Sequence, residues 1–167
     1  KDHYSGKLPF GDIRALKKEF QTNDIAAVIL EVIQGVGGLQ EASKEFYKEV
    51  EALCREFGVV FIADEIQAGY GRTGDFFAYQ KHQVQPDIIT IAKGMGNGFP
   101  IGGVLIHKNI KPWHGMLGTT FGGNHLACAA AIAVLDILKQ ENLMGIVRDR
   151  YHFILEQKNL PGVKQIK

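Results

Sequence analysis

The chain has 167 residues, a formal net charge of +1 at pH 7 and 46% hydrophobic residues. A chain of this length forms one domain or a large part of one, and it can bury a hydrophobic core. The nearly balanced charge argues against a nucleic-acid or membrane partner that is bound mainly through electrostatics. The apolar stretches are also too short or too interrupted for a membrane-spanning helix.

The two cysteines, Cys54 and Cys128, are too few and too far apart for a disulfide framework or a zinc cluster. Both lie in apolar patterns with helical spacing, so we expect buried, reduced thiols and a reducing compartment. The segment from Lys1 to Tyr4 has no Met and no signal-peptide pattern, and the chain opens in the middle of a pattern. We therefore expect a piece of a longer protein.

In the first half of the chain, expected helices alternate with short apolar strands. Asp12 is placed to cap a helix with apolar positions at 13, 16 and 20. Residues 26–30 form a continuous apolar run, which is typical of a strand buried on both faces. A second helix over residues 46–57 ends at Gly58, and a second buried strand over 59–63 follows.

The same alternation continues in the second half. A third strand over residues 87–92 runs directly into Lys93, and a fourth covers 103–106. An Ala-rich helix begins at Asn124 and reaches about residue 139, and an amphipathic helix follows over 143–155. Pro161 and Gly162 indicate a turn, after which residues 163–166 begin a strand. This order predicts an α/β domain with a mostly parallel sheet sandwiched by helices.

Polar side chains stand where three of these strands end. Glu31 and Gln34 follow the first, Asp64 and Gln67 the second, and Lys93 the third. In open α/β sheets, ligands bind beyond the carboxyl ends of the strands. We therefore expect these side chains to meet in one crevice.

Asp64 and Gln67 suit the recognition of an aromatic heterocycle. A carboxylate at a strand end can pair with a pyridinium nitrogen, which keeps the ring protonated and able to accept electrons. Gln67 can donate a hydrogen bond to a phenolic oxygen of the same ring. The simpler alternatives are a turn-capping role for Asp64 and an exposed turn position for Gln67.

Lys93 is unusual because it follows an apolar strand without a break, whereas most lysines are solvated surface charges. An amine beside an apolar wall has a lowered proton affinity and can form a Schiff base. The freed amine can then carry a proton between substrate and cofactor carbons. The glycines that alternate over residues 94–98 leave room for these movements.

A third feature precedes the Ala-rich helix, where Thr119 and Thr120 are followed by Phe121, two glycines and Asn124. Hydroxyl groups and free backbone N–H groups at the start of a helix suit a phosphate. An ordinary Asn N-cap with a Gly-rich approach explains the spacing equally well.

Taken together, these motifs resemble the class III (ornithine-type) aminotransferases, which are fold type I pyridoxal-phosphate enzymes. The matching strings occur in the family's order and cover nearly the whole chain. They are residues 31–35, 61–67, 69–74, 86–88, 92–94 and 119–124.

The resemblance implies a role for each matching residue. Lys93 would be the Schiff-base lysine, Asp64 would bind the pyridine nitrogen and Gln67 the ring oxygen. Thr120 would bind the phosphate of pyridoxal 5'-phosphate (PLP) from the neighbouring subunit of a homodimer with shared active sites. The family is cytoplasmic and moves an amino group to a 2-oxo acid, usually 2-oxoglutarate.

The resemblance also divides the chain into two parts. Residues 1–140 would be part of the PLP-binding large domain, and residues 141–167 would begin the C-terminal small domain. The family's first phosphate loop, its ring-stacking aromatic residue and its substrate arginine have no counterpart in these 167 residues. An isolated segment of this kind would be an inactive fragment.

One substitution bears on the substrate. Where ornithine-specific members carry Gln-Gly-Glu, this chain has Val36, which cannot pair with a carboxylate-binding arginine. We therefore expect acetylornithine or succinylornithine, substrates of arginine biosynthesis, rather than free ornithine. A 4-aminobutyrate or glutamate-semialdehyde aminotransferase remains the alternative.

Overall fold

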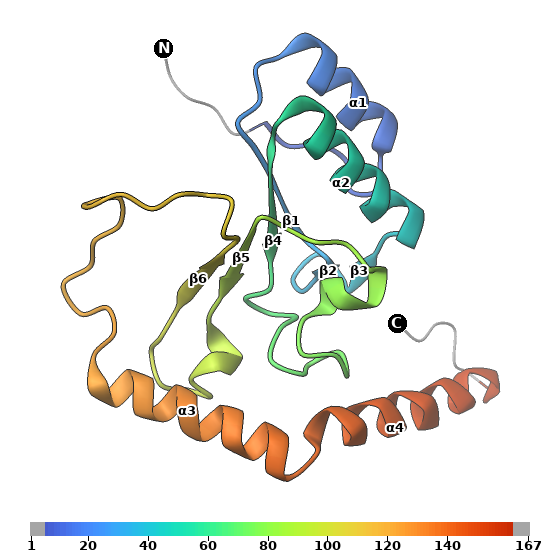
Figure 1. Cartoon of the computed structure of the whole chain (residues 1–167). Coiled ribbons are helices and arrows are strands. Elements are labelled where there is room, and N and C mark those ends of the chain that lie inside the picture. Colours follow the sequence, from blue (N-terminus) through green and yellow to red (C-terminus); the bar gives the residue numbers. More distant parts are fainter. Residues whose placement is uncertain (1–5, 162–167) are drawn as a thin grey trace.

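The structure is a computed structural model that describes residues 6–161. Its centre is a sheet with strand order β1-β4-β5-β6 (Figure 1). β1–β4 and β4–β5 are parallel, whereas β5–β6 is antiparallel. The strands are β1 (Ala27–Glu31), β4 (Val60–Asp64), β5 (Ile88–Ile91) and β6 (Gly103–Ile106). The mostly parallel sheet predicted from the sequence is confirmed.

Two helices, α1 (Ile13–Thr22) and α2 (Lys44–Phe57), pack against each other and cover one face of the sheet (Figure 1). The predicted cap of α1 is confirmed, because Asp12 Oδ1 accepts hydrogen bonds from Arg14 N and Ala15 N, both at 3.0 Å. α2 ends at Gly58, whose φ of 68° is left-handed and favours glycine.

The hydrophobic core lies between these helices and the sheet. Tyr47 from α2 and Phe61 from β4 are fully buried in it. Tyr47 also donates a hydrogen bond to the Val32 carbonyl at 2.6 Å, so its hydroxyl is satisfied inside the core. Burial raises the pKa of Tyr47 to about 12.

The other face of the sheet is open within residues 6–161. The prediction that residues 26–30 are buried on both faces is wrong, because Ile29 is 60% exposed. β1 is an edge strand here, and no described helix packs over this face. All four residues of β6 are exposed as well. Within residues 6–161, helices cover one face of the sheet, and the second layer of the expected sandwich is not among the described residues.

Three short elements fill the connections. After β1 comes a hairpin of β2 (Ile33–Gln34) and β3 (Gln40–Glu41). The 3₁₀ turn η1 (Ala78–His82) precedes β5, and η2 (Lys93–Met95) follows it.

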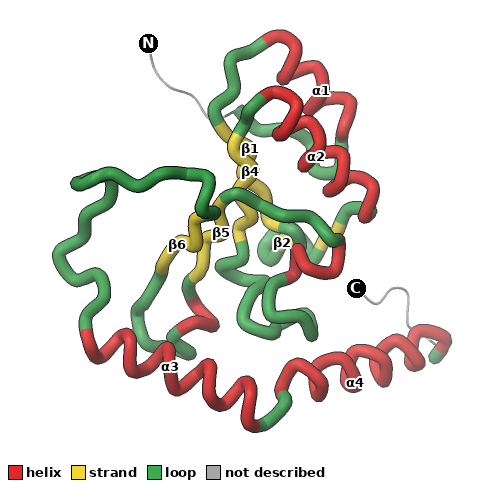
Figure 2. The backbone as a smooth tube through the Cα atoms, viewed as in Figure 1, coloured by secondary structure: helices red, strands yellow, loops and turns green. Residues whose placement is uncertain are grey.

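Two long helices, α3 (His125–Gln140) and α4 (Leu143–Glu156), follow one another beside the carboxyl edge of the sheet (Figure 2). Asn124 caps α3 as predicted, accepting a hydrogen bond from Ala127 N at 2.9 Å. α4 has no buried residue, so its expected core face is not covered within the described chain.

After α4 comes the short turn η3 (Gln157–Asn159). The predicted strand over residues 163–166, and Gly162 of the turn before it, lie outside the described residues. No helix within residues 6–161 is long and apolar enough to cross a membrane.

The two cysteines differ in their surroundings. Cys54 is buried as predicted, and burial raises the pKa of its thiol to about 12. Cys128 is exposed, so the prediction of a buried thiol is wrong there. Cys128 lies on α3, whose apolar residues meet few partners within this chain.

Candidate functional site

The parallel strands bring their polar carboxyl ends to one edge of the sheet. In the strand register, Glu31 lies beside Asp64, and Asp64 lies beside Thr90. Neighbouring strands are about 4.8 Å apart. Lys93 follows Thr90 by three residues, which span at most about 11 Å. Asp64 and Lys93 are therefore close enough for one small molecule to reach both.

Asp64 has one carboxylate oxygen engaged and one without a partner. Its Oδ1 accepts hydrogen bonds from Ile66 N at 3.1 Å and from Thr90 Oγ1 at 3.0 Å. Within the described chain, no donor reaches Oδ2. The sequence reasoning missed Thr90, although its place two residues before the end of the apolar run puts it on the same face as Asp64.

Gln67 is half-buried against the turn of the β2–β3 hairpin. A Cβ added to Gly35 would lie 2.5 Å from the Gln67 side-chain carbon Cδ, so a larger residue at position 35 would displace the end of the Gln67 side chain. Gly35 N also donates to Glu31 Oε2 at 2.9 Å, which fixes the start of the hairpin. The structure thus brings Gln67 to the same edge as Asp64.

Lys93 is the first residue of η2 and has a left-handed φ of 43°. Such a backbone is strained for a residue with a side chain, and strain of this kind clusters at functional sites. Its amine forms no hydrogen bond or ion pair with any described residue. The predicted apolar wall is absent from residues 6–161, where the Lys93 side chain is exposed.

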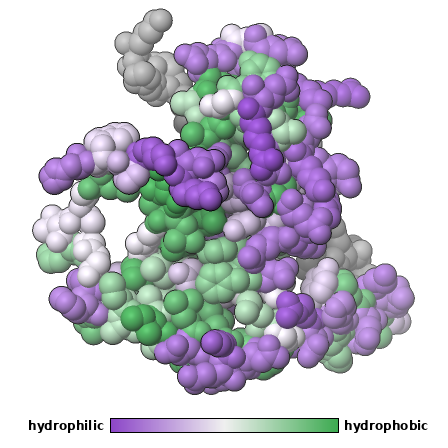
Figure 3. All heavy atoms as spheres, viewed as in Figure 1, coloured by the Kyte–Doolittle hydropathy of each residue, from purple (hydrophilic) through white to green (hydrophobic). Residues whose placement is uncertain are grey.

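Thr120 lies apart from the other three residues, on the segment of residues 107–124 that joins β6 to α3. This segment loops away from the sheet (Figure 1), and an open space separates it from the body of the molecule (Figure 3). Thr120 is exposed on it. A Cβ on Gly122 would overlap the Thr119 side chain, so a larger residue at position 122 would have to displace that side chain.

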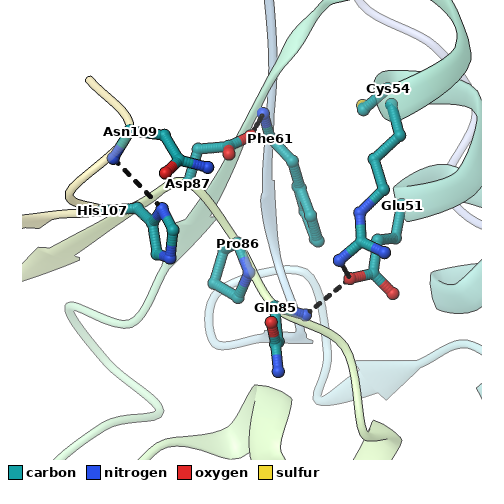
Figure 4. Close-up of a pocket in the computed structure, with 9 residues that line it drawn as sticks. Glu51, Cys54, Phe61, Gln85, Pro86, Asp87, His107 and Asn109 are labelled. Carbon is teal, nitrogen blue, oxygen red and sulfur yellow. Dashed lines mark hydrogen bonds and ion pairs between the residues drawn. The ribbon is translucent and has the colours of Figure 1, made fainter.

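A pocket lies at the opposite, amino edge of the sheet and does not include any predicted site residue. It has a volume of about 340 Å³ and contains Asp87, which precedes β5, and His107, which follows β6 (Figure 4). Its polar groups stabilise the fold: Asp87 Oδ2 accepts from Phe61 N at 2.9 Å, and Glu51 Oε1 accepts from Gln85 N at 3.0 Å. We therefore assign the candidate site to the carboxyl edge.

Glu65 is a second carboxylate at the carboxyl edge, and the sequence motifs did not predict a role for it. Glu65 directly follows Asp64 and is fully buried, and its two oxygens accept hydrogen bonds from Ala78 N and Tyr79 N. The alternation of buried residues along β4 indicates the burial of Glu65, because every second residue from Phe61 through Ala63 points into the core.

The comparisons with known proteins agree on one family. The model of the aminotransferase class-III family matches residues 7–161. The acetylornithine aminotransferase of Bacillus subtilis is 46% identical over 171 residues, which covers 99% of this chain and 44% of that protein. The acetylornithine aminotransferase of Bacillus cereus is 43% identical, and the match covers 96% of this chain and 42% of that protein.

Solved structures give the same result. The acetylornithine aminotransferase of Elizabethkingia anophelis has 36% identity and a TM-score of 0.74, with 92% of this chain and 41% of that chain covered. An ornithine aminotransferase of Toxoplasma gondii, which carries PLP at its active site in partial occupancy, has 32% identity and a TM-score of 0.81. That match covers 96% of this chain and 40% of the other.

The chain spans about two-fifths of the length of the curated relatives that it matches. Its match to the family model covers nearly all of the described residues, and its fold is that of fold type I PLP enzymes. The chain belongs to the class-III aminotransferases, a family of PLP-dependent enzymes.

Proposed function

We propose that this chain is the central, cofactor-binding part of an aminotransferase that moves an amino group from an N-acylated ornithine, acetylornithine or succinylornithine, to 2-oxoglutarate. The observation that carries the proposal is the unengaged Oδ2 of Asp64 on the sheet edge where Lys93 begins η2. The acetylornithine aminotransferases among the relatives support the donor class.

The residues present fit PLP. Asp64 Oδ2 offers an acceptor for a protonated pyridine nitrogen, and the Lys93 amine is unpaired within the described chain. Gln67, held against Gly35, is placed to hydrogen-bond the ring oxygen. When bound, PLP supplies an electron sink for the α-carbon of the substrate.

Each residue then has a separate task. Asp64 keeps the ring nitrogen protonated, and Thr90 fixes the orientation of that carboxylate through its hydroxyl. Lys93 would hold the cofactor, and its amine would carry the proton at the substrate α-carbon. Thr120 binds the phosphate of the partner subunit's cofactor, which agrees with its exposure on a segment that leaves the body of its own chain.

The proposal includes a cytoplasmic homodimer and a division of the chain at residue 140. Two free thiols in the described chain suit a reducing compartment. Asn142, with a left-handed φ of 47°, interrupts the helices α3 and α4 at the proposed division. Arg148 of α4 donates to the Gly74 carbonyl at 2.7 Å, so the second part would contact the first through this bond.

Val36 supports the N-acylated donor. It lies in the turn of the β2–β3 hairpin, is 91% exposed and directly follows Gly35, which packs against Gln67. An apolar side chain there cannot pair with a carboxylate-binding arginine, as the glutamate of ornithine-specific members does, so Val36 disfavours free ornithine as the donor.

Donor profiling of the intact protein that carries this chain tests the proposal. With PLP and 2-oxoglutarate present, acetylornithine or succinylornithine should give a kcat/KM at least about tenfold above that of ornithine, because a binding difference of that size needs only one good contact. A preference for 4-aminobutyrate or glutamate semialdehyde would overturn the proposed amino donor but would not change the assignment to the family. The variant Val36→Glu should raise the relative rate with ornithine.

A further inference from the structure

Glu65 is a buried carboxylate without a cationic partner. It is 0% exposed, and no ion pair reaches it within residues 6–161. Its Oε2 accepts from Ala78 N at 3.0 Å and its Oε1 accepts from Tyr79 N at 2.9 Å. Burial raises the pKa of Glu65, whereas these two hydrogen bonds lower it. Because of the two hydrogen bonds, both carboxylate oxygens of Glu65 are bound to the first turn of η1.

The backbone of Glu65 makes two further connections. Its N–H donates to the Thr90 carbonyl at 3.1 Å, which extends the pairing of β4 with β5. Its carbonyl accepts from Gly69 N at 2.9 Å, and a Cβ on Gly69 would lie 2.7 Å from that oxygen. Glu65 thus joins the end of β4 to three other segments, which are β5, the turn that begins at Gly69, and η1.

The geometry of a strand links this junction to Asp64. Successive side chains point to opposite faces, so Glu65 points into the core when Asp64 points to the open face. The burial of β4 follows this alternation, with Phe61, Ala63 and Glu65 buried and Asp64 half-buried. Any rotation of the strand end that moved Asp64 would have to break the Glu65 bonds to η1.

We propose that Glu65 is a positioning residue, whose bonds to η1 hold the Asp64 carboxylate in the orientation that receives the cofactor ring. The proposal rests on the proposed function, because it takes Asp64 as the partner of the ring nitrogen. A purely structural carboxylate would contribute to stability alone and would leave the protonation of the ring unchanged.

The variant Glu65→Gln separates these two roles. Glutamine has the same shape, but its NH₂ group cannot accept a hydrogen bond, so Ala78 N or Tyr79 N loses its acceptor. A buried donor left without a partner forces a local shift. We expect the Kd for PLP to rise about tenfold. The ¹⁵N resonance of PLP labelled at the ring nitrogen should move toward the unprotonated position in the intact, loaded protein.

Glu51→Gln is the matched control. Glu51 also accepts a hydrogen bond from a distant backbone group, Gln85 N at 3.0 Å, but it does so at the amino edge of the sheet. This variant should change stability without moving the ring-nitrogen resonance.

Ala78→Pro is a second variant for the case in which Glu65→Gln does not fold. It removes one N–H donor to Glu65 and keeps the carboxylate. Phe77 has φ −124° and ψ 139°, which a residue before proline readily adopts, and Ala78 is the first residue of η1, where proline is tolerated. The resonance should move in the same direction by a smaller amount.

The outcomes separate the two proposals. If the wild-type protein does not hold labelled PLP, the proposed function fails. If it does, and the ring-nitrogen resonance of folded Glu65→Gln and of Ala78→Pro equals that of the wild type, the positioning role of Glu65 is overturned and the proposed function stands.

Discussion

The two edges of the central sheet carry similar polar residues, but these residues differ in whether they have hydrogen-bond partners. At the carboxyl edge, Lys93 and Tyr70 adopt left-handed backbone conformations, and the Lys93 amine has no partner within the described chain. At the amino edge, Gln83 is left-handed as well, with a φ of 57°, so the difference between the edges lies in the partners of the polar side chains. There, Asp87 and Glu51 each hold the backbone of a neighbouring segment.

This difference separates residues that stabilise the fold from residues available for chemistry. A half-buried carboxylate such as Asp64, with one oxygen that receives no hydrogen bond within the described chain, is available to a ligand. The amino edge contains a pocket of about 340 Å³, yet its polar groups connect strands and helices. Pocket volume alone would have favoured the amino edge over the candidate site.

The largest expected effect is on kcat, when one lysine at each edge is replaced by alanine in the intact protein. Lys93→Ala should lower kcat at least about ten-thousandfold, because it removes the amine that binds the cofactor and moves the proton. Lys108→Ala, which alters an exposed lysine beside the amino-edge pocket, should leave kcat unchanged within about twofold. Steady-state kinetics with saturating PLP measures both. Comparable losses in the two variants would remove the distinction between the edges.

The second effect concerns stability at the amino half of β4. Phe61 is 1% exposed, and Phe61→Ala should lower the free energy of unfolding by about 3–5 kcal/mol through lost burial and a residual cavity. Phe61→Leu retains most of the apolar volume and should cost less than half as much. Denaturant unfolding of the intact protein measures both changes. Equal losses for the two variants would contradict a close-packed core at this position.

A pair of aspartates gives the third and sharpest contrast. Asp64→Asn should lower kcat about a hundredfold with little change in stability, because a neutral amide no longer favours the protonated ring. Asp87→Asn should instead cost about 1–2 kcal/mol of stability, because its bond to Phe61 N weakens, and should leave kcat nearly unchanged. Parallel kinetics and unfolding curves make the comparison. A reversed pattern would exchange the roles of the two edges.

The smallest effect is a pH dependence at the junction of the β2–β3 hairpin with η1. Burial lowers the pKa of His82 below its usual 6.5, and Glu41, whose Oε1 lies 3.0 Å from His82 Nε2, opposes this only in part. The unfolded chain then binds more protons than the folded one just below pH 6.5, so stability should fall as the pH falls through that range. His82→Gln should flatten this part of the profile. Unfolding curves from pH 7.5 to 5 provide the measurement, and an unchanged slope in the variant would exclude His82 as the cause.

Much of the fold was predictable because local sequence patterns reflect local geometry. The cap at Asp12, the left-handed end of α2 at Gly58 and the start of α3 at Asn124 each follow from residue types that satisfy free backbone groups. The meeting of Asp64, Gln67 and Lys93 at one edge followed from the parallel order of the strands.

Other features depend on contacts that no local pattern encodes. Ile29 and Cys128 lie in apolar patterns, yet both are exposed in the described chain because nothing packs against them there. The antiparallel direction of β6 depends on the path of the chain after η2. The role of Glu65 could not be predicted either, because its two hydrogen-bond donors belong to η1, which begins thirteen residues further along the chain.

The most direct test of the account is to find where PLP is attached. The intact protein would be loaded with PLP, reduced with borohydride to make the attachment permanent, digested and mapped by mass spectrometry. The account predicts a single modified lysine, Lys93, and the loss of this label in Lys93→Ala. A stable label on another lysine, with Lys93 unmodified, would contradict the assignment of the site.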